Sequence, residues 1–472
     1  MRNKLLLIGF IACLISCIYA QEDGWEPIIQ NGFGIQAQKT IPELEVYNDM
    51  IYVATAPLGP PATAMLWRSS NGIDSWEDVT PPLDADVSIH SFGKTTLGGG
   101  YFWLGTGNST KGAQIFRTQN GKDWIPISKR GFGKSGLIGA APNMVVFKGS
   151  GDATSYLYAA AGSHGSGIPA ELWRLPYDSK DSSDWIKLID FDTVATGMLN
   201  KVDLISYFEV WNDKIYFSTN ATGQLWESTD GINFTQNMNV GYGFGQAESN
   251  VVISALEIFK DTMYITTTNF NGGQLWRTGD GVTFTNITKD AFGEGAAVNE
   301  LRKPIVSQDK LWITGYTETT LSSGTPIWRS DDGINWVKSN VNGFGDTLNN
   351  GQNASLVGFR EFVYFGGPNY TAGAQLWRTP ATLGINDVPY KTCRTKLVPN
   401  PFSTKAAFDF ESECSSIAKI DIFNLTGQHV KAIVPEHGSE AIVERGNLNE
   451  GIYFYKIRSQ NGTISNGNFV IE

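Results

Sequence analysis

The sequence predicts an all-β protein: a seven-bladed β-propeller closed by an N-terminal strand, followed by a small C-terminal β-sandwich of immunoglobulin-like type. Three observations predict this fold. The 472-residue chain is rich in glycine, with 52 residues, and in aromatic residues, at 12%. Short alternating segments separated by Gly, Asp and Asn are typical of many short strands joined by turns. A short aromatic segment recurs along the chain as far as Trp377, and no tryptophan follows it.

The recurring segment reads aliphatic–aromatic–Arg–Ser/Thr, with small variations, and occurs seven times. In the fifth copy, alternating segments at 251–259 and 263–268 are followed by shorter ones at 274–278 and 283–288, with turns between them. Four short strands in this order make one propeller blade, and a fixed period indicates a repeat architecture. The aromatic positions, 49 to 57 residues apart, are Trp67, Phe116, Trp173, Trp226, Trp276, Trp328 and Trp377.

The two ends of the array complete each other. The seventh copy stops at Pro380 after three strands, whereas the chain begins with a strand-like segment at 25–29 and the sequence Asn-Gly-Phe-Gly, as in the tail of the sixth copy. We therefore expect residues 25–29 to form the outer strand of the last blade, which leaves no open sheet edge. The predicted domains are a propeller at 21–380, a linker at 381–393 and a C-terminal domain at 394–472.

The N-terminus has the composition of an export signal. Residues 1–20 contain the basic Arg2 and Lys4, an apolar stretch, and Ala20 as a cleavage point, which together indicate a signal peptide. Cys17 also lies in a sequence that fits lipoprotein cleavage, so a lipidated N-terminus is an open alternative. No other apolar run approaches the roughly 18–20 residues that span a bilayer, and we expect no transmembrane segment.

The charge balance narrows the class of partner. The chain has 36 basic and 47 acidic side chains, and loss of Arg2 and Lys4 with the signal leaves a net charge of 34 − 47 = −13. Such a surface repels nucleic acid, which we exclude as a partner.

Cys393 and Cys414 remain in the mature chain, and an exported compartment permits a disulfide between them. Two cysteines and four scattered histidines make no zinc site, and we expect no metal cofactor.

The turn after the repeated segment carries a second motif. It reads Ser-Asp-Asp-Gly-Ile-Asn-Trp at 330–336, with related sequences at 118–124, 228–234 and 278–284. An Asp or Asn side chain can cap such a tight turn, and Gly adopts the positive φ that it requires. The motif resembles the Asp-box, or BNR repeat, of sialidase-like propellers. In that family the turn lies away from the active face, so the resemblance implies the fold and not catalysis.

The catalytic residues of sialidases are not matched. That family uses three convergent arginines, a Tyr–Glu nucleophile pair and an acidic Asp. Outside the repeated segment this propeller offers only Arg130, Arg302 and Arg360. Arg360 falls in a turn between the first two strands of a blade, which places it on the face of the propeller opposite the active face of that family. The resemblance therefore does not imply sialidase activity.

The C-terminal region contains three further motifs. They begin at Leu397, at Ile420 and at Gly451, the last reading Gly-Ile-Tyr-Phe-Tyr-Lys-Ile. The region resembles the type A C-terminal sorting domain of the type IX secretion system of Bacteroidota. The resemblance implies the secretion machinery as a partner and a secreted or cell-surface location, and leaves open whether the domain is cleaved. The implied sorting residues are Pro399, Asn400, Pro401, Phe402, Gly427, Gly451 and Tyr453.

Two sets of polar residues are candidates for ligand binding in the propeller. Glu45, Glu209 and Glu257 each precede a tyrosine of the second strand by seven residues, so we expect them on inner strands facing the central channel. There they could bind a cation, calcium included, or pair with the repeated arginines. The second set follows the second strand of a blade, where asparagine also caps turns: Asn108, Asn220, Asn269 and Asn369.

These observations favour a non-catalytic, secreted or cell-surface propeller that binds a glycan or a protein, and that is a monomer. The polar positions recur from blade to blade, whereas a catalytic site uses a unique constellation. The alternative is a carbohydrate-active enzyme, a glycoside hydrolase or polysaccharide lyase, in which two channel carboxylates form an acid–base pair. A calcium-stabilised scaffold is the third hypothesis.

Overall fold

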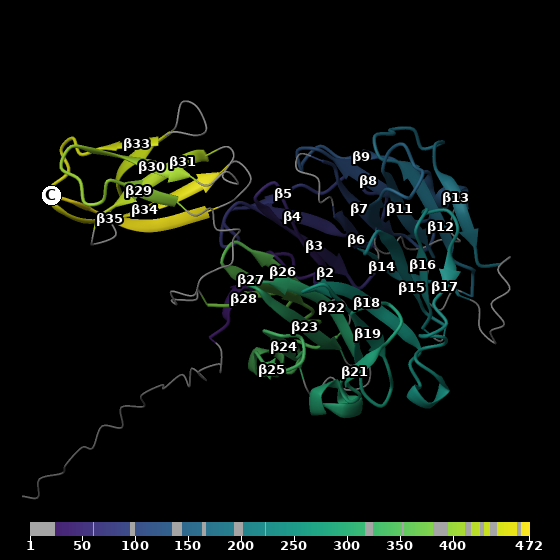
Figure 1. Ribbon diagram of the computed structural model, residues 1–472. Coiled ribbons are helices and arrows are strands. Elements are labelled where there is room, and N and C mark those ends of the chain that lie inside the picture. The colour runs from purple at the N-terminus through teal and green to yellow at the C-terminus, as the bar shows by residue number, and fades with distance from the viewer. Residues whose placement is uncertain are drawn as a thin grey trace, which may run out of the picture. The chain divides into compact units, whose positions relative to one another are not determined.

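The computed structural model describes residues 24–380 and 395–472, apart from 60, 95–99, 135–143, 163–166, 193–201, 222, 317–323, 352–353, 411–416, 425–428, 435–440 and 460–463. Contacts divide the chain into two compact units, Met1–Leu383 and Gly384–Glu472. Both units are built from β-strands (Figure 1). The signal peptide expected at 1–20, Gly427 and the cysteine pair Cys393 and Cys414 lie outside the described residues.

The strands of the first unit follow one another in sets of four. The first three sets are β2 (Gln38–Tyr47), β3 (Met50–Pro57), β4 (Met65–Ser69) and β5 (Trp76–Asp78); β6 (Ser88–Lys94), β7 (Phe102–Gly107), β8 (Ile115–Thr118) and β9 (Ile125–Pro126); and β10 (Met144–Phe147), β11 (Tyr156–Ala161), β12 (Glu171–Pro176) and β13 (Ile186–Asp190).

The next sets continue the same order of two longer and two shorter strands. They are β14 (Ile205–Trp211), β15 (Lys214–Thr219), β16 (Leu225–Ser228) and β17 (Thr235–Gln236); β18 (Val252–Phe259), β19 (Thr262–Thr268), β20 (Leu275–Thr278) and β21 (Thr285–Thr288); and β22 (Glu300–Ser307), β23 (Lys310–Tyr316), β24 (Ile327–Ser330) and β25 (Val337–Lys338). Short 3-10 turns occur at η1 (Arg130–Gly133), η2 (Gln246–Glu248), η3 (Ala291–Gly293), η4 (Gly295–Ala297) and η5 (Asn342–Gly345).

The last set joins the two ends of the array. It contains β26 (Ser355–Phe359), β27 (Phe362–Gly367) and β28 (Gln375–Arg378), and its fourth strand is β1 (Glu26–Ile29) from the N-terminus. The pairing of β1 with β28 is antiparallel and places Glu26 opposite Arg378. Beside it, Trp25 is buried and donates its indole N–H to the Ser339 carbonyl at 2.7 Å. The strand expected at 25–29 thus lies where the sequence places it.

The first strands of the sets pack against one another in succession. Each contacts the first strand of the set before and of the set after, and β2 contacts both β6 and β26. Within a set the strands are antiparallel and in chain order, except that two pairs of sets are hydrogen-bonded into larger sheets, through β6 with β10 and through β19 with β22. Successive sheets around a common centre, with first strands innermost (Figure 1), define a β-propeller.

Aromatic pairs fill the junctions between blades. In five links that enter a blade, a phenylalanine with φ between 53° and 65° packs on the repeated tryptophan of that blade, with ring centroids 4.1–5.0 Å apart. Four of these pairs are stacked, and the pair of Phe292 with Trp328 is tilted. Positive φ is unusual for a bulky residue and persists where the surroundings fix it. The Phe-Gly sequence at 92–93 predicts another such link, and this prediction is wrong, because Phe92 lies within β6 and packs on Phe102. The pairs are Phe33–Trp67, Phe132–Trp173, Phe244–Trp276, Phe292–Trp328 and Phe344–Trp377.

The turn between the third and fourth strands is closed by its own side chains. Ser330 Oγ accepts the Gly333 backbone N–H at 2.8 Å, and Asp332 Oδ1 accepts those of Ile334 and Asn335 at 2.8 and 2.7 Å. The same bonds recur at Asp280, where the backbone N–H groups of Val282 and Thr283 hold the pKa of the carboxyl at about 2. These carboxylates are therefore committed to backbone.

The second unit consists of two antiparallel sheets around one hydrophobic core. One sheet contains β29 (Thr395–Val398), β30 (Lys405–Phe410) and β33 (Ala441–Glu444), in that order. The other has the order β32 (His429–Ile433), β31 (Ile417–Phe423), β34 (Gly451–Ser459) and β35 (Ile464–Ile471).

Candidate functional site

The centre of the propeller contains a cavity of about 460 Å³ whose wall is formed by the first strands of the blades. The three glutamates expected to face the channel, Glu45, Glu209 and Glu257, all line it. The sequence did not single out three further titratable residues of the wall: Glu43, Tyr207 and Lys303. Glu43 lies two residues before Glu45 on β2, so the period-2 alternation of a strand was a signal that could have found it.

The three predicted glutamates make the same local bond. The backbone N–H of the following residue donates to Oε1 at 2.9 Å for Glu45, at 2.9 Å for Glu209 and at 3.3 Å for Glu257. Equivalent positions on three blades therefore present equivalent carboxylates, and one oxygen of each is engaged by the channel wall.

A buried ion pair spans the channel wall between two blades. Lys303 Nζ donates to Glu43 Oε1 and, at 3.1 Å, to the Pro42 carbonyl. The Glu43 residue is 6% exposed. Burial raises the pKa of Glu43 and lowers that of Lys303, and in each case the partner opposes the shift. Lys303 thus neutralises Glu43 locally.

Tyr207 stands among these carboxylates. Burial, reinforced by the negative charges of Glu257 and Glu209, raises its pKa well above the usual value for a tyrosine. A phenol held in this environment stays protonated at neutral pH and is suited to donate a hydrogen bond, not to act as a nucleophile or base.

The repeated arginines pair away from the channel. Arg68 contacts Glu77 of β5 at 2.8 Å, and Arg378 contacts Glu26 of β1 at 2.7 Å. In each case the carboxylate belongs to the outer strand of the blade that carries the arginine. The interpretation that these arginines neutralise the channel glutamates was therefore wrong for Arg68 and Arg378.

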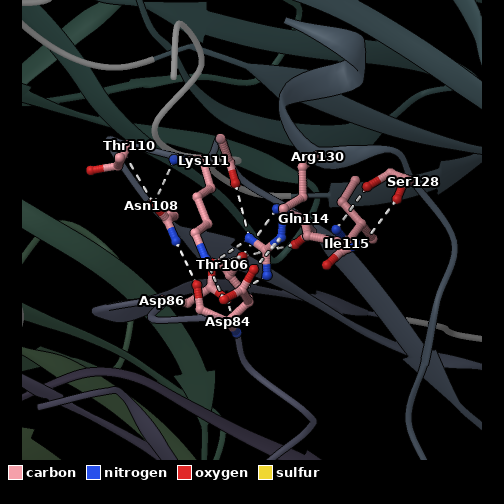
Figure 2. A network of polar contacts seen from close by, with 11 residues as sticks. Asp84, Asp86, Thr106, Asn108, Thr110, Lys111, Gln114, Ile115, Ser128 and Arg130 are labelled. Atoms are coloured by element: carbon pink, nitrogen blue, oxygen red, sulfur yellow. Dashed lines mark hydrogen bonds and ion pairs between the residues drawn. The ribbon is translucent and has the colours of Figure 1, made fainter. Parts of the chain in front are cut away.

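The loops that follow the second strands lie at one end of the blades, together with the links that enter the next blade. We call this end the loop face. In the second blade it contains a buried polar network (Figure 2). Asp86, which is fully buried, accepts from Thr106 Oγ1 at 3.0 Å and forms two bonds of 2.9 Å with the guanidinium of Arg130. This bidentate pair ties the link entering the blade to the segment leaving it.

Asn108 belongs to the same network (Figure 2). Its Nδ2 donates to the Asp84 carbonyl at 2.9 Å, and its Oδ1 accepts the N–H groups of Thr110 and Lys111 at 3.1 and 2.8 Å. The side chain is buried, so both ends of its amide hold backbone of the loop face.

The other three predicted asparagines are buried in the same way. Each donates to an Asp or Asn side chain just before the first strand of its blade, which the sequence did not single out. A recurrent Asp or Asn some 20 residues upstream was the available signal. The donor–acceptor pairs are Asn220–Asp203, Asn269–Asn250 and Asn369–Asn349.

Large apolar side chains are exposed on this same face. Leu58, in the loop after β3, is 70% exposed, and Phe270, in the loop after β19, is 60% exposed. Tyr242 and Leu348, in links that enter the next blade, are also exposed. The loop face thus combines buried, hydrogen-bonded polar side chains with apolar side chains that reach solvent.

Within the described residues, no group of three or more His, Cys, Asp or Glu side chains is placed to hold a metal ion. In the same part of the chain no helix has the length and apolar character that a bilayer crossing would need.

In the second unit, the described sorting residues cluster at one end of the sandwich. Asn400 Oδ1 accepts the Val470 N–H at 2.8 Å, and the N–H of Phe402 donates to the Val470 carbonyl at 3.1 Å. Pro399 and Pro401 are exposed beside them. Gly451 begins β34, two residues before the buried Tyr453.

A β-propeller followed by a small two-sheet domain is the class that the fold defines. Residues 396–472 match the family model for the secretion system C-terminal sorting domain. This domain directs proteins through the type IX secretion system, so the chain is secreted or exposed at the cell surface, and its C-terminal unit interacts with the secretion machinery.

Comparisons with known sequences and with solved structures gave the following results. No curated protein sequence matches the chain. PorZ, a surface component of the type IX secretion system of Porphyromonas gingivalis, is 10% identical with a TM-score of 0.45, over 92% of this chain and 59% of that one. The chain thus spans less than two thirds of PorZ. The propeller domain of a Pyrococcus furiosus protease is 9% identical (TM-score 0.44; 75% and 99% covered), and the phage phi92 endosialidase 11% identical (TM-score 0.40; 95% and 87% covered).

Proposed function

We propose that the mature chain is a secreted or cell-surface binding module without catalytic activity, whose loop face binds a glycan or a protein. The exposed apolar and aromatic side chains of that face, Phe270 above all, carry this proposal. Aromatic rings offer large contact area at low entropic cost, and exposed apolar groups on a fixed surface are typical of binding sites. The buried asparagines and the Asp86–Arg130 pair supply the fixed loops.

The proposal includes the finer architecture. The propeller has seven blades closed by β1, its turns are of the Asp-box type, and the sorting domain is an immunoglobulin-like sandwich. The pairing of β1 with β28 and the contact of β2 with β26 support closure. Residues 1–20 are removed as a signal peptide, 381–393 form a linker, and the protein is a monomer without a cofactor.

The test is a glycan and polysaccharide screen of the purified mature chain that records binding and product release together. The Phe270→Ala variant should weaken binding by about tenfold or more. Val282→Ala is the matched control, because Val282 is 61% exposed in the same blade but at the opposite end, and its affinity should be unchanged. Equal loss in both variants, or none in either, would exclude Phe270 from the site.

The alternative, a glycoside hydrolase or polysaccharide lyase, is favoured by the channel carboxylates Glu209 and Glu257, which share a cavity with Tyr207. Release of new reducing ends or unsaturated products would establish it and overturn the proposal. In that case Glu209→Gln and Glu257→Gln should abolish turnover and leave binding in place, whereas a non-catalytic module yields no product with any variant.

A further inference from the structure

The aromatic residues of the sorting motifs face the interior of the C-terminal domain. Phe402 is 4% exposed, and its ring centroid lies 5.6 Å from that of Phe469. Tyr453 is also buried, stacks on Phe469 at 5.5 Å and donates its hydroxyl to the Asn449 carbonyl at 2.9 Å. These side chains build the core and cannot be contacted by a partner of the folded domain.

The residues that alternate with the buried aromatic residues along β34 point outward. Along β34, Ile452 and Phe454 alternate with the buried tyrosines, and they are 47% and 43% exposed. The register places Phe454 opposite Phe423 of β31, and Ile452 opposite Val470 of β35. Residues directly opposite on neighbouring strands share a face of the sheet. We call these four residues, Phe423, Ile452, Phe454 and Val470, the β34 patch.

The β34 patch is continuous with the proline segment of the other motif. Val470 is bonded through its N–H to Asn400 and through its carbonyl to Phe402. Pro399, Asn400 and Pro401 are themselves exposed. Two sequence motifs about fifty residues apart thus meet on one surface, and the last residues of β35 join them.

We propose that this surface, the β34 patch with the adjoining segment Pro399–Pro401, is where the type IX secretion machinery binds the folded domain, through an apolar pocket that receives Phe454. The solvent-facing side of a two-sheet domain is usually polar, so large apolar side chains here serve contact and not folding. A sorting domain must present something to its receptor, and the buried motif aromatics are unavailable for that purpose. The inference is independent of what the propeller binds.

The test follows export of the full-length protein in a bacterium with a working type IX system. The double variant Ile452→Ser/Phe454→Ser should lower the exported fraction by about tenfold or more, as loss of a contact hot spot would, with the protein accumulating in the periplasm. The control is Val434→Ser, which removes a 68% exposed apolar side chain that follows β32, and it should be exported normally. Thermal unfolding of the purified chains reports whether each variant is folded.

Two single variants separate contact from folding. Phe454→Leu retains an apolar side chain and should be exported, whereas Phe454→Lys, equally compatible with an exposed strand position, should not. Normal export of the double variant or of Phe454→Lys would overturn the proposal, as would failure of Phe454→Leu and Phe454→Lys alike. Self-association of the wild-type chain that the double variant abolishes, with export unchanged, would assign the surface to a second copy instead.

Discussion

Two glycines of the repeated turn allow the packing between blades to be measured separately from backbone strain. Gly333 and Gly281 occupy the same turn position in adjacent blades, and both have φ of +73°. A Cβ atom at Gly333 would lie 1.8 Å from the Tyr264 hydroxyl of the preceding blade. At Gly281 the nearest atoms, from Trp211 and Tyr216, are 3.6 Å away, which is an ordinary contact. The pair therefore differs in the neighbouring tyrosine and not in backbone conformation.

Both Gly→Ala variants should lose the about 1–2 kcal/mol that a side chain costs in left-handed backbone. Gly333→Ala should lose a further about 1–3 kcal/mol, because the methyl group displaces a side chain from a packed core. Tyr264 is 2% exposed and has little room to move. Tyr264→Phe in the Gly333→Ala background should restore only part of this loss, since Cζ would still lie 2.4 Å from the new methyl group.

The assay is denaturant unfolding of the purified mature chain, followed by tryptophan fluorescence, with the free energy of unfolding compared between variants. Equal destabilisation by Gly333→Ala and Gly281→Ala would refute the reasoning, because it would leave backbone strain as the sole cost. A larger loss for Gly281→Ala would refute it as well.

Three further predictions use the same measurements. Trp25→Ala should cost about 3–5 kcal/mol of unfolding free energy, because it empties a buried site. Glu26→Ala, which breaks a partly exposed ion pair, should cost about 0–1 kcal/mol. Comparable losses would argue against the idea that buried contacts hold β1 in the last blade. Arg130→Met should cost about 3–5 kcal/mol by leaving its buried carboxylate partner uncompensated, and Lys111→Met, from an exposed pair, should have little effect on the denaturation midpoint. The folded pKa of Asp280 is about 2, below its unfolded value, so its contribution to the free energy of unfolding is present above about pH 4 and is lost as pH falls through 2. Asp280→Asn should flatten that part of the stability–pH profile. An unchanged slope would contradict the assignment of this stability to the Asp280 carboxylate.

The repeat could be recognised from the sequence because each blade uses the same local chemistry. A tryptophan, a capped turn and alternating strands recur at a fixed period, and the leftover segment at 25–29 complements the incomplete last copy. The glutamates could be placed in the channel because their distance from the strand-two tyrosine is constant. These predictions rest on interactions between residues close in sequence or equivalent by repetition.

The unique features of the site could not be obtained in this way. Lys303 lies in an irregular part of its strand, where the register shifts between Arg302 and Ile305, so repetition does not show which way it faces. Its pairing with Glu43 joins residues 260 positions apart. The partners of Arg68 and Arg378 were misassigned for a related reason, since each pairs with a glutamate of the outer strand of its own blade, and for Arg378 that strand comes from the other end of the propeller.

The pairing of β1 with β28 has a consequence for where the polypeptide can be opened. The first and last strands of the propeller are antiparallel neighbours in one sheet, so a short peptide could join them, and new termini could be introduced at the turn between the third and fourth strands of another blade. Every strand pairing of the propeller would be retained in such a circular permutant. The fold itself therefore does not dictate which blade combines strands from the two ends of the propeller.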